Sequence, residues 1–303
     1  MDIAYESEDF PLGGPVTNGN ARLQASWDDI LWAALTVGRP NRAAVFQHGD
    51  ASLYEAVFRL SLVRMAVEQA GPKATRLRRT RAARTLDPSE KGAVNYFVGM
   101  TMCKMFADRV LSAPWMLHLD VFRPQLDPVL TGRSRPDLIG QRSTGDWLAL
   151  ESKGRISAPD AKAKSNAKQQ AQRCVSINGA VVKFHIGAVT YLRSDVLEFY
   201  WRDPEPNNEV GINVVLSPDV WQHHYRLPVA LNQAGHDLMN GTVDLTVDVY
   251  PSVLRLLLEK KWADAKAWCE TEASTLAKEG YRPDGLLVRA GQSWKHSYQE
   301  VQG

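Results

Sequence analysis

The chain has 303 residues, 44% of them hydrophobic and 23% charged, and its 36 basic residues nearly balance 34 acidic ones. Such a composition is that of a globular protein with enough material for one large domain or two modest ones. The three cysteines lie far apart without a CxxC pattern, which argues against a zinc ribbon or a disulfide framework. The acidic first ten residues lack the features of a secretory signal, and the uncharged run at 92–103 is too short to span a bilayer. We therefore expect a cytoplasmic protein that does not enter membranes.

Residues 1–89 predict a helical N-terminal region. The segment 1–25 is rich in Gly, Pro, Asn and acids, as in a loose arm. Residues 26–38 predict a helix with Ser26 as its N-cap. Apolar residues at three- and four-residue spacing predict a second helix over 51–71.

A basic linker at 73–84 follows these helices. It holds six basic residues and no acid. Such a run is either a solvated linker or helix face, or an arm that follows the phosphates of a nucleic acid, because clustered cations gain from counterion release. The candidate phosphate contacts in this run are Arg78, Arg79 and Arg81.

Residues 90–203 predict a mixed α/β core. A long, mostly apolar helix begins near residue 90, and strand-like segments and an alanine-rich helix come after it. These later segments are strands at 115–122, 136–140 and 146–154, a helix at 159–177, and strands at 179–195 and 196–203. Their order predicts an α/β sheet with helices packed on it.

Residues 204–303 predict a mainly helical C-terminal region that opens on a linker-like cluster, DPEPNNEVG. The clearest helix is expected over 251–279, where Pro251 suits the first turn, Gly280 suits the end, and apolar residues form a stripe. The adjacent histidines His223 and His224 would point in different directions on a helix, so we interpret them as structural rather than metal-binding.

The candidate catalytic and metal-binding residues lie in the stretch RSRPDLIGQRSTGDWLALESKGR, residues 133–155. Side chains alternate across a strand, so Glu151 and Lys153 share one face at the end of their strand. The segment PDLIG can pair with that strand as a hairpin. With a suitable register, this pairing brings Asp137 near Glu151.

Two carboxylates that converge on one point repel each other unless a cation lies between them. Such oxygen ligands suit Mg²⁺ or Mn²⁺, which take their remaining ligands from water and from substrate phosphate. The metal would lower the pKa of a bound water, and Lys153 could orient that water or stabilise developing negative charge. This combination suits phosphodiester hydrolysis.

At these residues the chain resembles the PD-(D/E)xK nuclease superfamily. The matching residues are Pro136-Asp137 and Glu151-x-Lys153, with 13 residues between the two acids. The resemblance covers roughly 90–203 and implies a restriction-endonuclease-like core, an αβββαβ mixed sheet flanked by helices, with helical N-terminal and C-terminal additions. It also implies that Asp137, Glu151 and the backbone carbonyl of Ser152 bind the metal, and that Lys153 is the catalytic lysine.

Two features of the superfamily pattern are incomplete in this chain. Some members use a glutamine in a QxxxY pattern on the second core helix; here Gln169 and Gln170 are candidates, but Cys174 stands where the tyrosine would be. Many members also place a glutamate on the first core helix. The acids available for that role or as an extra metal ligand are Glu90, Asp108, Asp120 and Asp127.

The charge around the motif is positive. From Arg133 to Arg173 there are nine basic residues and four acids. A lysine-rich solvated helix accounts for the lysines of 159–177, but less well for the arginines near the motif. A polyanionic substrate would favour such a surround, so we take as candidate nucleic-acid contacts Arg133, Arg135 and Arg155.

A second Arg-Pro-Asp, at 282–284, has no ExK after it before the chain ends. We interpret that copy as coincidence. It serves as an internal control for the first.

These observations predict a Mg²⁺- or Mn²⁺-dependent nuclease that acts on DNA in restriction, defence or repair. DNA is chosen because the superfamily usually cuts it; the residues themselves do not distinguish DNA from RNA. One alternative is a nucleic-acid-binding or partner-binding protein on the same fold without turnover. Another is a different phosphoesterase, or a structural protein with a chance motif, in which case Asp137 and Glu151 would lie far apart. A homodimer or a partner protein would suit cleavage of both strands.

Overall fold

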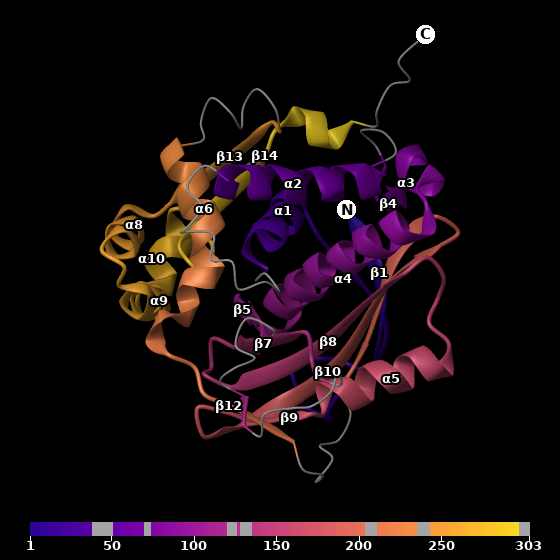
Figure 1. The fold of residues 1–303 in the computed structure, drawn as a ribbon, viewed down its shortest axis with the longest axis horizontal. Coiled ribbons are helices and arrows are strands. Elements are labelled where there is room, and N and C mark those ends of the chain that lie inside the picture. The colour runs from indigo at the N-terminus through magenta and orange to yellow at the C-terminus, as the bar shows by residue number, and fades with distance from the viewer. Residues whose placement is uncertain are drawn as a thin grey trace.

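The computed structural model describes residues 1–37, 51–69, 74–119, 126–127, 135–203, 211–234 and 243–296. Its centre is a large mixed β-sheet flanked by helices (Figure 1). The main strand order is β2-β1-β11-β10-β8-β7-β5, and β8 runs parallel to β10 but antiparallel to β7. These strands are β1 (Asp2–Glu8), β2 (Gly19–Gln24), β5 (Trp115–His118), β7 (Leu138–Gln141), β8 (Trp147–Arg155), β10 (Ala180–Arg193) and β11 (Val196–Arg202).

Shorter strands extend this sheet, and a separate hairpin lies near the C-terminus. The short strands are β3 (Val67–Gln69), β4 (Leu77–Arg79), β6 (Leu126–Asp127), β9 (Cys174–Ile177) and β12 (Ile212–Val214); the hairpin consists of β13 (Leu245–Val249) and β14 (Leu286–Ala290). The helices are α1 (Trp27–Thr36), α2 (Ala51–Ala66), α3 (Arg81–Thr85), α4 (Pro88–Leu111), α5 (Ala161–Ala171), α6 (Gln222–Ala234), α8 (Pro251–Leu258), α9 (Trp262–Thr271) and α10 (Ala273–Lys278).

Helices α4 and α5 pack on opposite faces of the sheet (Figure 1). On one face, a Cβ added to Gly154 of β8 would lie 1.7 Å from the carbonyl oxygen of Asn95 in α4. On the other face, a Cβ added to Gly187 of β10 would lie 2.8 Å from the backbone nitrogen of Lys168 in α5. Only glycine permits such close backbone approach, so these two positions set how tightly both helices cover the central strands.

The predicted helix starts at 26–38 and near residue 90 are confirmed by their caps. The side chain of Ser26 accepts a hydrogen bond from the backbone of Asp29, whose carboxylate accepts one back from the backbone of Ser26. Asp87 and Glu90 form the same capping box at the start of α4, with Pro88 in its first turn. These local bonds satisfy amide groups that a helix end otherwise leaves without partners.

The predicted loose arm at 1–25 is wrong. Strand β1 lies parallel to β11, and β2 pairs antiparallel with β1. The polar sequence of these strands gives no strand pattern. They form because backbone hydrogen bonds to a partner strand distant in the sequence stabilise them.

The predicted linker at 73–84 is also wrong over its described residues. Strand β4 and helix α3 occupy it, and the side chain of Thr80 accepts a hydrogen bond from Ala83 at the helix start. The helix expected over 159–177 ends at Ala171, and Cys174 lies on strand β9.

The helix expected over 251–279 is divided into α8, α9 and α10. Its first break falls near Lys260, whose φ of 59° is left-handed and ends α8. The C-terminal region therefore combines short helices with the β13–β14 hairpin. In the described part of the chain no helix has both the length and the apolar character of a membrane span.

The three regions of the sequence share one hydrophobic core. Helix α1 from the first region contacts the C-terminal hairpin, where the backbone of Ala290 donates a hydrogen bond to Asp28. The indole of Trp32, also on α1, donates to Asp284. The two ends of the chain thus pack together beside α4, the first helix of the central region.

Candidate active site

The β7–β8 hairpin brings the two halves of the 133–155 motif together. Leu138 of β7 pairs with Leu150 of β8, so Asp137 lies across from Glu151 at the end of the paired region. The backbone N–H of Ser152 donates a 3.0 Å hydrogen bond to the carboxylate of Asp137. The register required by the sequence argument is therefore present, and the two acids do not lie far apart.

Glu151 and Lys153 occupy the same face of β8, and they contact each other. The ammonium group of Lys153 donates a hydrogen bond to Oε1 of Glu151. The side chain of Glu151 is only 2% exposed, whereas that of Lys153 is 39% exposed. The site therefore has a buried carboxylate with its lysine at the boundary to solvent.

The second carboxylate oxygen of Glu151, Oε2, is buried, and no described residue forms a hydrogen bond with it. Buried polar atoms without partners are exceptions in folded proteins and call for an explanation. A carboxylate oxygen that accepts no hydrogen bond beside a second carboxylate is an arrangement that a hard cation would satisfy. The two carboxylates, Asp137 and Glu151, thus have the oxygen donors that Mg²⁺ or Mn²⁺ prefers.

Burial is the main influence on the pKa values of the two acids. Burial and the nearby charge of Asp137 raise the pKa of Glu151 to about 8, against the opposing effect of Lys153. Burial also raises the pKa of Asp137, although the Ser152 N–H and Lys153 partly offset this. Each carboxyl therefore holds a proton more readily than an exposed acid would.

The described residues contain no group of three or more His, Cys, Asp or Glu side chains arranged to hold a metal. The predicted extra acid Asp120 lies outside the described residues, and only the backbone of Asp127 is described, in β6. Neither acid of α4 serves the site: Glu90 caps the helix, and Asp108 pairs with Arg282. Any further ligands within the described part would have to come from water or substrate.

Helix α4 brings a tyrosine near the acid pair, which sequence reasoning missed. Tyr96 lies 2.8 Å, oxygen to nitrogen, from Nε2 of His118 on β5. Burial raises the pKa of Tyr96, and the charges of Asp137 and Glu151 raise it further. Burial lowers the pKa of His118 to about 3, so its ring is neutral. The contact depends on how α4 packs against β5 and β7, which no local sequence pattern records.

The glutamine candidates lie on α5, over the face of β10 that carries Gly187. Gly187 is the β10 partner of Glu151, so α5 covers the side of the sheet to which Glu151 belongs. Gln169 is exposed and Gln170 is half-buried. No hydrogen bond from either side chain reaches the acid pair among the described residues.

The arginine candidates differ in how far they are already paired. Arg79 forms an ion pair with Asp195 at 2.6 Å, and Arg155 approaches Asp160 at 3.6 Å. Arg78 is exposed on β4, and Arg81 begins α3. Arg135 is half-buried beside the motif, where its charge lowers the pKa of Asp137, whereas Arg133 lies outside the described residues.

The chain matches no protein-family model, no curated protein and no solved structure. The functional interpretation of the site thus depends on the contacts of its own residues. Among these, the approach of Asp137 to Glu151, the unpartnered oxygen of Glu151 and the adjacent Lys153 are the most informative.

Proposed function

We propose that this protein is a metal-dependent nuclease that hydrolyses phosphodiester bonds of DNA. One observation carries the proposal: Asp137 and Glu151 converge where the pairing of β7 with β8 ends, a buried oxygen of Glu151 lacks a partner among the described residues, and Lys153 stands beside it. Structural acid pairs are normally satisfied by hydrogen bonds or by cations. Here Asp137 accepts from Ser152 and Oε1 of Glu151 contacts Lys153, but Oε2 of Glu151 has neither kind of partner among the described residues, which favours a role in binding and catalysis.

The fold supports the same proposal. Helix α4, strands β5, β7 and β8, helix α5 and strand β10 follow one another in the order helix, strand, strand, strand, helix, strand, with the short β6 and β9 between them. This is the order of the αβββαβ core that the motif resembles. The acids of the motif lie where β8 continues beyond its pairing with β7, and no described strand pairs with that edge of β8 there.

A bound Mg²⁺ would supply an activated water and neutralise charge on the phosphate. Its ligands would be Asp137, Glu151 and the carbonyl of Ser152. Because burial raises the pKa of Glu151 to about 8, this carboxyl must lose a proton before it can ligate, and metal affinity should rise with pH. Lys153 can leave Glu151 and donate its N–H groups to the attacking water or to a phosphate oxygen.

A non-catalytic nucleic-acid-binding or partner-binding protein is the second candidate. The observation that favours it is the contact between Lys153 and Glu151, which occupies both groups, together with the lack of a third acid among the described residues. In that case the pair would have a structural role and turnover would be absent.

Cleavage of supercoiled, linear and single-stranded DNA, with RNA in parallel, tests the proposal. Each substrate is incubated with Mg²⁺, Mn²⁺ or EDTA. We expect metal-dependent cutting by the wild type and a fall of about 1000-fold in Lys153→Met and Asp137→Asn, because each removes a group that stabilises charge in the transition state. The substrate panel separates DNA from RNA cleavage and endonuclease from exonuclease action.

Lys162→Met is the matched control, since Lys162 is an exposed lysine of the same basic stretch on α5. It should cut at the wild-type rate. Equal cutting by all variants would assign the activity to another site or to a contaminant. Salt-sensitive DNA binding without cutting under any metal condition would favour the binding protein instead.

A further inference from the structure

The exposed aromatic side chains gather on two helices, α2 and α4. Tyr54 and Phe58 of α2 are 67% and 61% exposed, and Tyr96 of α4 is 39% exposed. No other aromatic side chain in the described part of the chain is exposed to this degree. Tyr54 and Phe58 are four residues apart and therefore share one face of α2. Aromatic rings normally bury most of their area, so this grouping requires an explanation.

Helices α2 and α4 pack together beside the acid pair of the proposed active site. The guanidinium group of Arg59, next to Phe58 in the sequence, lies 5.7 Å from the ring centre of Phe97, next to Tyr96. Figure 1 shows the two helices next to each other on the same side of the sheet. The charges of both acids raise the pKa of Tyr96. Tyr96 is therefore the exposed ring that lies near the acid pair.

Tyr96 is held at its hydroxyl and is open to solvent along its ring. The hydroxyl forms a 2.8 Å hydrogen bond with Nε2 of His118, a side chain buried on β5. One turn earlier on α4 stands Gly92, where an added Cβ would meet nothing within 4 Å. Glycine has no side chain that could cover the ring. A ring fixed in this way loses little conformational entropy when a ligand stacks on it.

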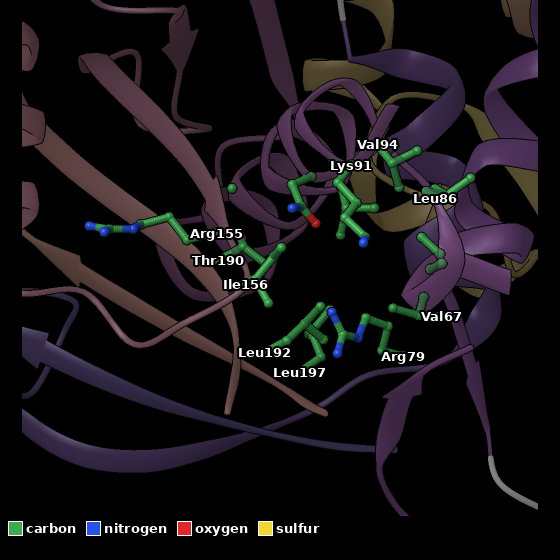
Figure 2. Close-up of a pocket in the computed structure, with 15 residues that line it drawn as sticks. Val67, Arg79, Leu86, Lys91, Val94, Arg155, Ile156, Thr190, Leu192 and Leu197 are labelled. Carbon is green, nitrogen blue, oxygen red and sulfur yellow. The ribbon is translucent and has the colours of Figure 1, made fainter. Parts of the chain in front are cut away.

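The other flank of α4 has no room for a ligand of this kind. The crevice between the first turns of α4 and the ends of β8 and β10 has a volume of about 20 Å³, which holds about one water molecule. Figure 2 shows Val94 of α4 and Leu192 of β10 on opposite sides of this crevice. A planar ring cannot enter it, so an aromatic ligand of α4 would lie on the side of Tyr96.

The charges of α2 permit a polyanion to approach the two rings on its surface. Glu55 is the only acid of this helix. It is paired with Arg59 at 2.8 Å and with Arg226 at 3.2 Å. A phosphate near α2 would therefore meet no unpaired acid of that helix.

We infer that the proposed nuclease acts on DNA whose bases are unpaired at the site, with one base stacked on Tyr96 and neighbouring bases on Phe58 and Tyr54. The inference rests on the proposed function and names the form of its substrate. Aromatic rings stack on unpaired bases of any sequence, whereas the bases of a duplex are already stacked on each other. A phosphate at the acid pair and a base on Tyr96 would belong to one strand.

Fluorescence anisotropy with the full chain in EDTA tests the inference without cleavage. The labelled probes are an oligothymidine, an abasic strand of the same length and a duplex of that length. We expect the oligothymidine to bind about tenfold more tightly than the abasic strand, because only the oligothymidine has bases to stack. The duplex should also bind less tightly than the oligothymidine.

Substitutions at the rings test which residues carry the difference. Tyr96→Leu should lose about tenfold in affinity for the oligothymidine and leave the abasic strand unchanged. Tyr96→Phe keeps the ring and should bind as the wild type does. Phe58→Leu should lose affinity in the same way as Tyr96→Leu. Tyr250→Leu is the matched control, because Tyr250 is a partly exposed tyrosine at the start of α8 that stacks on Trp268; both affinities should stay unchanged.

Four results would overturn the inference: equal affinity for the oligothymidine and the abasic strand, unchanged affinity in Tyr96→Leu, tighter binding of the duplex, or self-association of the wild type that Phe58→Leu abolishes. The last would assign the aromatic surface to contact between two copies of the chain. Each of these results is compatible with metal-dependent cutting and would leave the proposed nuclease intact. Base-dependent binding that Tyr96→Leu removes, without cutting in Mg²⁺ or Mn²⁺, would support the stacking surface and overturn the nuclease.

Discussion

The chain contains Arg-Pro-Asp twice, and the two aspartates have opposite surroundings. Asp284 is fully buried, and its carboxylate accepts hydrogen bonds from the indole of Trp32 at 2.7 Å and from Nε2 of His224 at 2.8 Å. Asp137 accepts one backbone hydrogen bond and lies beside Glu151, whose second oxygen has no partner. Asp284 is held by buried side-chain donors, whereas Asp137 has a single backbone donor and a neighbouring acid with one oxygen that no described group contacts.

The pKa values follow these surroundings. Burial alone would raise the pKa of Asp284, but the bond from His224 and nearby positive charge lower it below its usual value. At Asp137, burial prevails and raises the pKa. The tripeptide is thus compatible with a structural acid or with a candidate ligand, and the partners that the fold brings to it decide which.

The Asp284 network reaches well beyond the tripeptide. His224 lies 3.3 Å, nitrogen to nitrogen, from the ammonium group of Lys104, which is fully buried on α4. Burial lowers the pKa of Lys104 to about 7 and that of His224 to about 4. Arg282 pairs with Asp29 and Asp108. The network therefore joins α1, α4, α6 and the C-terminal hairpin, which is a structural role.

Parallel Asp→Asn substitutions give the largest contrast between the two copies. In Asp284→Asn an amide group replaces one of two carboxylate oxygens: the one that accepts from Trp32 and His224, or the one that accepts from the backbone of Leu286. In either case a buried donor loses its acceptor, so we expect a loss of about 3 kcal/mol in the free energy of unfolding. Asp137→Asn relieves repulsion with Glu151 and should change stability by less than about 1 kcal/mol. Urea denaturation of both variants measures the difference. Equal losses would contradict the assignment of different roles.

The pH dependence of stability tests the surroundings of Asp137 through its neighbour Glu151. The folded pKa of Glu151, about 8, is above its ordinary value near 4.5, so the folded state holds the proton more tightly. Stability should therefore fall as pH rises from about 4.5 to about 8, by on the order of 5 kcal/mol. Glu151→Gln should remove this part of the fall and be more stable than the wild type at pH 8.

Denaturation of the wild type and Glu151→Gln at pH 5, 6, 7 and 8 tests this expectation. The difference between the two proteins isolates Glu151 from the other titrating groups. If metal binds as proposed, Mg²⁺ at pH 8 should stabilise the wild type and leave the variant unchanged. A constant difference across the pH range would mean that Glu151 titrates normally.

The smallest expected change in stability concerns Thr190, whose buried hydroxyl forms no hydrogen bond with any described residue. Thr190→Val keeps the shape of the side chain and removes a hydroxyl that makes no hydrogen bond. It should raise the free energy of unfolding by about 1 kcal/mol. Thr36→Val on α1 is the matched control, because its buried hydroxyl donates to the Trp32 carbonyl. The two variants should therefore differ in sign, and a loss in both would contradict the assignment.

Much of the central region follows from local sequence patterns. Helix α4 was predictable because Asp87, Pro88 and Glu90 mark its start and apolar residues continue it. The β7–β8 hairpin was predictable because both strands are apolar segments joined by a short polar turn, in which Gly145 adopts a φ of 86°. These signals act within a few residues, so the sequence expresses them directly.

The same patterns failed where a distant partner provides the stabilisation. The polar strand β1 exists because it pairs with β11, almost two hundred residues away. Helix α5 ends at Ala171 because the chain then pairs as β9 with β10 and β12. Backbone hydrogen bonding between strands depends on which edge is available, and no local periodicity records that.

The sequence by itself determined the acids and the lysine of the candidate site, their spacing, and the hairpin that joins them. Only the tertiary structure decided that Oε2 of Glu151 has no partner among the described residues, and that Asp284 accepts hydrogen bonds from Trp32 and His224. The physical reason is that hydrogen-bond satisfaction and burial belong to groups that meet across the fold. Alternation along a strand places a side chain on a face, but the elements packed on that face determine its chemistry.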